Sequence, residues 1–108
     1  FLMIEEARID GHGHNNDVQG LIDEMEIMDR VMQVVLDYAD AHPETLVVIT
    51  ADHETGGVNI GYDGRPYFST AGHSGSVVPV FAYGPGAEQF AGLMDNTDIP
   101  ARILSLIE

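Results

Sequence analysis

The sequence of 108 residues contains no cysteine, no lysine and no tryptophan. Without cysteine the chain cannot form a disulfide or a thiolate metal site, so a transition metal would have to bind through His, Asp or Glu. Four basic side chains, all arginine, stand against eighteen acidic ones, which gives a formal net charge of −14. This balance argues against nucleic acid and against an anionic membrane surface as partners, because both are recognised mainly through Lys and Arg. No apolar run approaches the roughly 20 residues that span a bilayer.

The hydropathy pattern predicts a single α/β domain over residues 1–108, with a layered sheet and flanking helices. Apolar residues at steps of three and four predict a helix over residues 18–39, which Asn16 or Asp17 caps and Pro43 ends. Residues 45–50 are apolar on both faces, which favours a central parallel strand. The other expected elements are a buried strand over 1–4, a loop over 5–17, a hairpin over 58–68, a strand over 76–83, and helices over 87–94 and 100–107.

Histidine and acidic residues gather at three places where loops adjoin predicted strands. Asp10 and His14 stand four residues apart around two glycines, Asp52-His53 follows the central strand, and His73 lies in a glycine-flanked loop. Ligand sites in open α/β sheets form beyond the carboxyl ends of the strands, and imidazole with carboxylate suits zinc. The sequence therefore predicts a metal site that draws on all three segments.

Adjacent side chains on an extended segment point in opposite directions, so Asp52 and His53 are better suited to two neighbouring ions than to one. Paired cations about 3.5–4 Å apart can clamp the attacking and leaving oxygens of a phosphoryl transfer. The competing interpretation is structural, because residues 10–17 taken alone also fit an Asx-turn and helix-capping loop, and Asp52-His53 taken alone also fits a turn. His42 is interpreted as a solvated surface histidine, and Ser74 and Ser76 as structural loop residues.

Three segments of the sequence resemble the C-terminal metal-binding motifs of the alkaline phosphatases. They are Glu5-Glu-Ala-Arg-Ile-Asp10-Gly-His-Gly-His14-Asn-Asn-Asp17, Thr50-Ala-Asp52-His53-Glu-Thr-Gly-Gly57 and Gly72-His73-Ser-Gly75. Residues 81–87 and 92–98 are similar to the closing strand and final helices of that family. The resemblance implies two zinc sites and one Mg2+ site. It assigns Asp10, His14 and His73 to the first zinc, Asp52 and His53 to the second, and Glu5 to magnesium, and it leaves His12 as a candidate substrate contact.

The resemblance also implies an activity, the hydrolysis of small phosphate monoesters through a phosphoseryl intermediate. It further implies a periplasmic or secreted protein that could form a homodimer. In that family the nucleophilic serine, a shared aspartate and the phosphate-binding arginine lie upstream of these motifs, and none can be assigned here. We therefore expect the C-terminal portion of an alkaline phosphatase-like fold, inactive without an N-terminal portion of the same enzyme. The alternatives are a phosphomutase or sulfatase of the same superfamily, or a non-catalytic metal-binding module.

Overall fold

The structure is a computed structural model that describes residues 1–107. The chain divides into two compact units, which are described separately below. The first unit contains residues 1–33 and 53–77, and the second contains residues 34–52 and 78–107. Helix α2 (Val18–Ala41) contributes residues to both.

Helix α2 confirms the helix that the apolar periodicity predicts. It begins at Val18, and the Asp17 carboxylate caps it by accepting a hydrogen bond from the backbone N–H of Gly20 at 3.1 Å. This is the geometry of an N-cap, in which a side-chain oxygen satisfies a donor that the first helical turn leaves without a partner. The helix ends at Ala41, two residues before Pro43, as expected from the bias of the residue preceding a proline against helical angles.

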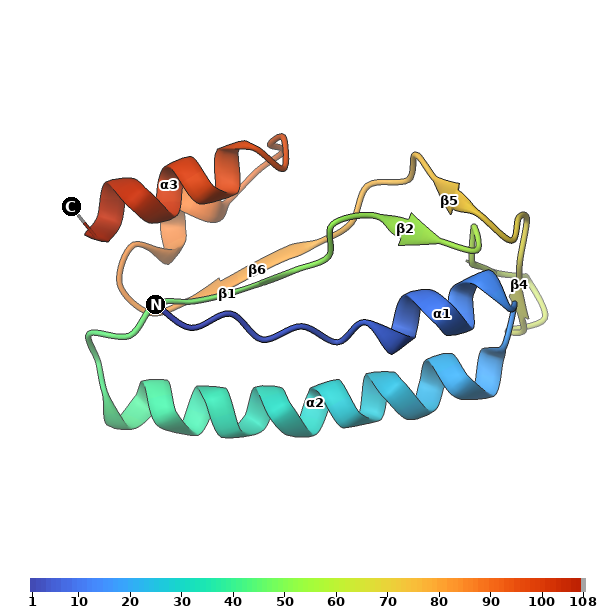
Figure 1. The fold of residues 1–108 in the computed structure, drawn as a ribbon, viewed down its shortest axis with the longest axis horizontal. Coiled ribbons are helices and arrows are strands. Elements are labelled where there is room, and N and C mark those ends of the chain that lie inside the picture. Colours follow the sequence, from blue (N-terminus) through green and yellow to red (C-terminus); the bar gives the residue numbers. More distant parts are fainter. Residues whose placement is uncertain (108) are drawn as a thin grey trace. The chain divides into compact units, whose positions relative to one another are not determined.

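In the second unit, strand β1 (Val47–Thr50) pairs with β6 (Val80–Tyr83). The pairing is antiparallel, so the predicted parallel direction is wrong. An apolar run indicates that both faces of a strand are buried. Whether the strand is parallel or antiparallel to its neighbour depends on the connection between the two strands, which the run does not specify. The short 3-10 helix η1 (Ala87–Phe90) follows β6, and α3 (Asp98–Ile107) packs against η1 (Figure 1). The buried apolar residues of this unit are Ala39, Val47 and Phe90.

The first unit contains a helix where the sequence predicts a loop. Helix α1 (Arg8–His14) lies along the N-terminal part of α2 and contacts β2 (Glu54–Thr55), as Figure 1 shows. Its glycines and histidines have weak helix propensity, so tertiary contacts override the local preference. The expected hairpin is confirmed by β3 (Asn59–Ile60) and β4 (Pro66–Tyr67), and a second antiparallel pair joins β2 to β5 (His73–Ser74).

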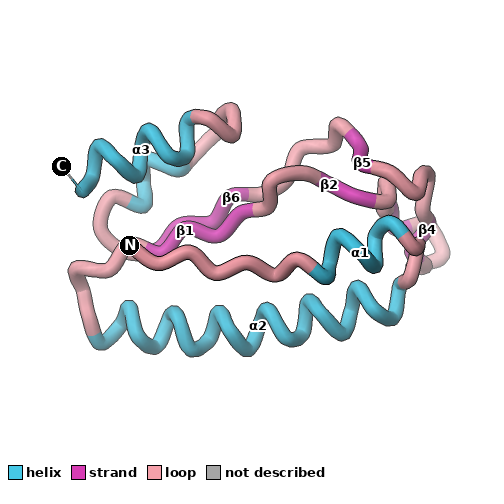
Figure 2. Tube along the Cα trace, in the orientation of Figure 1, coloured by secondary structure: helices cyan, strands magenta, loops and turns pink. Residues whose placement is uncertain are grey.

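The predicted buried strand over residues 1–4 is wrong. This segment is irregular and exposed, with 97% of Phe1 and 48% of Ile4 accessible (Figure 2). An apolar run becomes a strand only when another strand supplies hydrogen-bond partners. Among the described residues β1 pairs with β6 alone, and the first four residues find no such edge.

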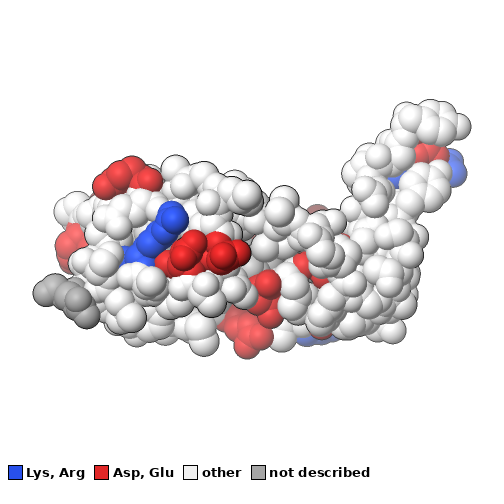
Figure 3. Space-filling view, turned by 90° about the horizontal axis from the view of Figure 1, so that it is seen from above, with Lys and Arg blue, Asp and Glu red and all other residues white. Residues whose placement is uncertain are grey.

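The fold is an α/β arrangement, as the sequence predicts, with helices beside small antiparallel sheets. On the face drawn in Figure 3 the acidic side chains form separate patches among uncharged residues, with few basic atoms. Glu24 is the buried charged residue among those described, 5% exposed. No helix within residues 1–107 combines the length and the apolar content that crossing a bilayer requires.

Replacing Gly20 with alanine should destabilise the fold by about 1–3 kcal/mol, although alanine normally favours a helix. A Cβ at position 20 would overlap the His12 imidazole and the Asp17 carboxylate. Gly11→Ala is the matched control, because no atom lies within 4 Å of its Cβ position, and it should gain up to about 1 kcal/mol. Chemical unfolding of both variants measures the difference, and equal stability would contradict the packing described here.

Candidate metal centre

The β2–β5 pair fixes which side chains share a face. Thr55 lies opposite His73 in the register, and Glu54 lies opposite Ser74. Because successive side chains of a strand point to opposite faces, Thr55 and His73 project from one face and Glu54 and Ser74 from the other. The imidazole of His73 is thus presented beside the hydroxyl of Thr55.

Helix α1 brings the second half of the cluster. Asp10 and His14 are four residues apart on α1, so they occupy the same face of the helix. Gly13 lets this helix approach β2 closely, since a Cβ at that position would lie 3.0 Å from both the Thr55 side chain and its backbone oxygen. A larger residue at position 13 would push Asp10 and His14 away from His73.

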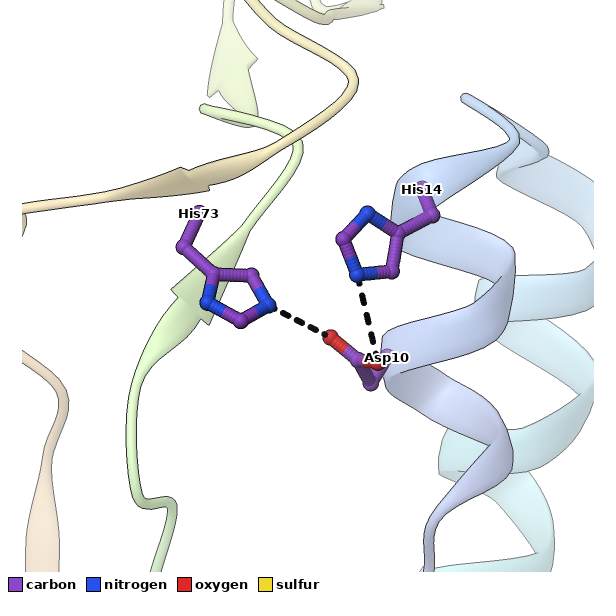
Figure 4. Close-up of side chains that lie close together, drawn as sticks. All are labelled: Asp10, His14 and His73. Atoms are coloured by element: carbon purple, nitrogen blue, oxygen red, sulfur yellow. Dashed lines mark ion pairs between the residues drawn. The ribbon is translucent and has the colours of Figure 1, made fainter.

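The Asp10 carboxylate lies between the two imidazoles (Figure 4). His14 Nε2 is 3.4 Å from Asp10 Oδ2, and His73 Nε2 is 3.5 Å from Asp10 Oδ1. Each of the three residues offers a ligand atom within 4.8 Å of the others. The side chains are 40–50% exposed, so an ion could enter from solvent.

Hydrogen bonds prepare these groups to donate electron pairs. His14 Nδ1 lies 2.7 Å from the carbonyl oxygen of Ala71, which can only accept, so Nδ1 carries a proton and a neutral His14 would have its Nε2 available for a metal ion. The hydroxyl of Thr55 is the main cause that lowers the pKa of Asp10, and the nearby histidines add to it. One carboxylate and two imidazoles at this spacing fit a zinc ion that keeps one position open.

Of the other predicted site residues, His53 joins the cluster. Its ring stacks on that of His73 with centroids 3.7 Å apart, and its Nδ1 lies 3.2 Å from the Thr55 hydroxyl. Asp52 belongs to the second unit and is exposed two residues after the end of β1. Glu5 is exposed in the segment before α1. Neither Asp52 nor Glu5 is part of the three-residue group found within residues 1–107, and their metal roles stay predictions.

His12 lies on the side of α1 that faces α2. Its Nδ1 is 2.9 Å from Asp17 Oδ2, and its Nε2 is 3.8 Å from Glu24 Oε1. Arg8 approaches the same Glu24 oxygen at 3.2 Å. His12 is two residues away from both Asp10 and His14, so its side chain points away from their face of the helix. The structure therefore gives this side chain a role in joining α1 to α2, and its proposed substrate contact stays untested.

Sequence reasoning missed two residues that organise the site, Thr55 and Glu54. The Glu54 carboxylate accepts hydrogen bonds from the Ser74 hydroxyl and from the backbone N–H groups of Gly57 and Val58. These bonds, with that of Ser74 first, lower the pKa of Glu54. They tie the loop after β2 to β5. Both residues lie directly after Asp52-His53, within the segment over residues 50–57 that resembles the family motif, and this position is the sequence signal that could have indicated their role.

The comparisons with known proteins point to the same family as the sequence motifs. The family model "Alkaline phosphatase" matches residues 1–71 and 65–108. Alkaline phosphatase 3 of Bacillus subtilis is 28% identical, over 100% of this chain and 40% of its own length. An alkaline phosphatase of a Shewanella species has a TM-score of 0.90 and 26% identity, over 94% of this chain and 44% of the other. A TAB5 alkaline phosphatase variant with Mg bound in its M3 site has a TM-score of 0.84 and 40% identity, over 93% and 33%. The chain thus spans less than half the length of each of these relatives.

Replacing Asp17 with alanine should destabilise the fold at neutral pH, because the helix cap and the acceptor for His12 are both lost. The backbone N–H of Gly20, followed by His12, lowers the pKa of Asp17 below its usual 3.8. Such a carboxyl stabilises the fold above pH 3.8, and the contribution is lost as the pH falls through the lowered pKa. Urea unfolding at neutral pH and in strong acid should show a difference from wild type that shrinks on acidification. Asp29→Ala, further along α2, is the control, and a pH-independent difference would contradict the prediction.

Proposed function

Since this chain belongs to the alkaline phosphatase family, we propose that it provides metal sites of a hydrolase acting on small phosphate monoesters. The observation that carries the proposal is the convergence of Asp10, His14 and His73 from α1 and β5. Their nitrogen and oxygen atoms suit zinc, and the family resemblance assigns the same three residues to a first zinc ion. The relatives are alkaline phosphatases, and this chain spans only part of their length.

Two further sites complete the proposal. Asp52 and His53 would contribute to a second zinc site, and Glu5 to a magnesium site. The stacking of His53 on His73 supports the second assignment, because it brings a further imidazole to the edge of the first cluster. The magnesium named for the TAB5 variant supports a magnesium site in the family without locating it on this chain.

In the reaction, Asp10, His14 and His73 would hold and orient an ion. When bound there, a zinc ion would supply Lewis-acid chemistry: it would lower the pKa of water and neutralise charge on a phosphoryl oxygen. Without an ion, the carboxylate of Asp10 and the formal charge of −14 would repel a phosphate dianion. A divalent cation held by these residues would offset this negative charge and would favour the approach of the phosphate.

The nucleophile is not assigned to a residue of this chain. Ser74 is tied to Glu54 through its hydroxyl, and no serine of the sequence stands in a motif that matches the family nucleophile. We therefore place the phosphoserine, a shared aspartate and the phosphate-binding arginine in another portion of the same enzyme. On the family resemblance alone, we also propose a periplasmic or secreted location and a homodimer.

The full-length protein should hydrolyse p-nitrophenyl phosphate, lose that activity in EDTA and regain it on addition of zinc and magnesium. His73→Ala should reduce kcat/KM by more than the roughly 10- to 100-fold that loss of an outer hydrogen-bond partner costs, because a ligand itself is removed. His42→Ala is the matched control, since its ring stacks on Tyr38 in the second unit. Steady-state kinetics with metal titration gives kcat/KM for both variants.

Unchanged activity of His73→Ala would contradict the proposed role of the cluster. A phosphomutase would instead transfer phosphate within a sugar phosphate, and a sulfatase would prefer p-nitrophenyl sulfate. A protein that binds zinc but turns over none of these substrates would be a metal-binding module.

The chain of 108 residues by itself should show no hydrolysis of p-nitrophenyl phosphate above the buffer rate, because it offers no matched nucleophile. Circular dichroism of the same sample checks that its helices have formed. Metal-dependent turnover by a folded sample of this chain would overturn the placement of the nucleophile elsewhere.

A further inference from the structure

Thr55 is the residue at which the two predicted zinc sites meet. Its Oγ1 lies 2.6 Å from Asp10 Oδ1, a ligand atom of the first site. The same oxygen lies 3.2 Å from Nδ1 of His53, a predicted ligand of the second site. Thr55 also lies opposite His73 in the β2–β5 register. One hydroxyl thus contacts both sites and sits beside a third ligand.

The direction of these bonds follows from counting protons. A threonine hydroxyl has one hydrogen, and an ionised carboxylate can only accept. The hydroxyl therefore donates to Asp10, and its oxygen can only accept from His53. The neutral His53 ring must then carry its proton on Nδ1, which leaves the lone pair on Nε2.

We propose that Thr55 is a positioning residue that links the two metal sites through a directional chain, from His53 Nδ1–H to the Thr55 hydroxyl and from that hydroxyl to Asp10 Oδ1. The chain fixes the His53 tautomer that presents Nε2 as a ligand, and it orients the Asp10 carboxylate for the first ion. This inference rests on the proposed function for the identity of the ligands, but the hydrogen-bond chain can be tested without a metal ion.

The surroundings of Thr55 hold the hydroxyl in this direction. Its Cγ2 methyl lies against the backbone of Gly13, where an added Cβ would be only 3.0 Å away. A β-branched side chain has few accessible rotamers, and this contact leaves the hydroxyl facing Asp10. Outer partners of this kind orient metal ligands and raise their affinity.

The test compares Thr55→Val, which keeps the branched shape but removes the hydroxyl, with Thr55→Ser, which keeps the hydroxyl. In the full-length, metal-free protein at alkaline pH, ¹⁵N NMR of the imidazoles reports which nitrogen of His53 carries the proton. We expect Nδ1 in the wild type and in Thr55→Ser, and a loss of that preference in Thr55→Val. Zinc affinity, measured by competition with a chelating dye, should fall about 10- to 100-fold in Thr55→Val and recover in large part in Thr55→Ser.

Thr50→Val is the control, because it removes a threonine hydroxyl that can donate to the carbonyl oxygen of Ala51 or of Pro79 in the second unit. It should leave the His53 tautomer unchanged. A wild-type His53 protonated on Nε2 overturns the inference even if Thr55→Val does not fold. Wild-type zinc affinity in a folded Thr55→Val overturns it while the proposed function stands. A wild type that binds no zinc overturns the proposed function and this inference together.

Discussion

The close approach of α1 to β2 is the constraint on which the candidate metal centre depends. Gly13 permits it, because a side chain there would meet Thr55. Once the helix and the strand are in contact, Asp10 and His14 on one face of α1 stand across from His73 on β5. The hydroxyl of Thr55 then reaches Asp10 across the same contact. A packing interaction of the backbone thus sets the ligand geometry.

The opposite face of α1 secures the helix that this packing needs. A chain of polar contacts runs from Asp17 through His12 to the buried Glu24, which Arg8 also approaches. Burying a carboxylate without a partner would be costly, so these contacts hold α1 and α2 in one register. The two histidines of α1 therefore have different roles, since His14 faces the cluster and His12 faces the neighbouring helix.

Sequence features within a few residues of one another correctly predicted the elements that depend little on tertiary contacts. Helix α2 has a long apolar stripe, an Asp17 cap and a proline after its end, and these act within a few residues of each other. The short helix α1 carries weak helix formers, so its sequence favours a loop, and only contacts with α2 and β2 make it a helix. The antiparallel pairing of β1 likewise could not be predicted from the sequence, because an apolar pattern indicates burial and does not indicate which strand pairs with which.

The sequence by itself determined which residue types could bind a metal and which segments carry them, since the absence of cysteine leaves His, Asp and Glu, and these stand in recognisable motifs. It also determined the family, the long helix and the hairpin, because each of these depends on residues that are close together in the sequence. Only the tertiary structure decided that His12 faces Glu24, that His53 stacks on His73, and that Thr55 bonds to Asp10. Those contacts depend on side-chain direction and on the approach of distant backbones, which no short stretch of sequence specifies.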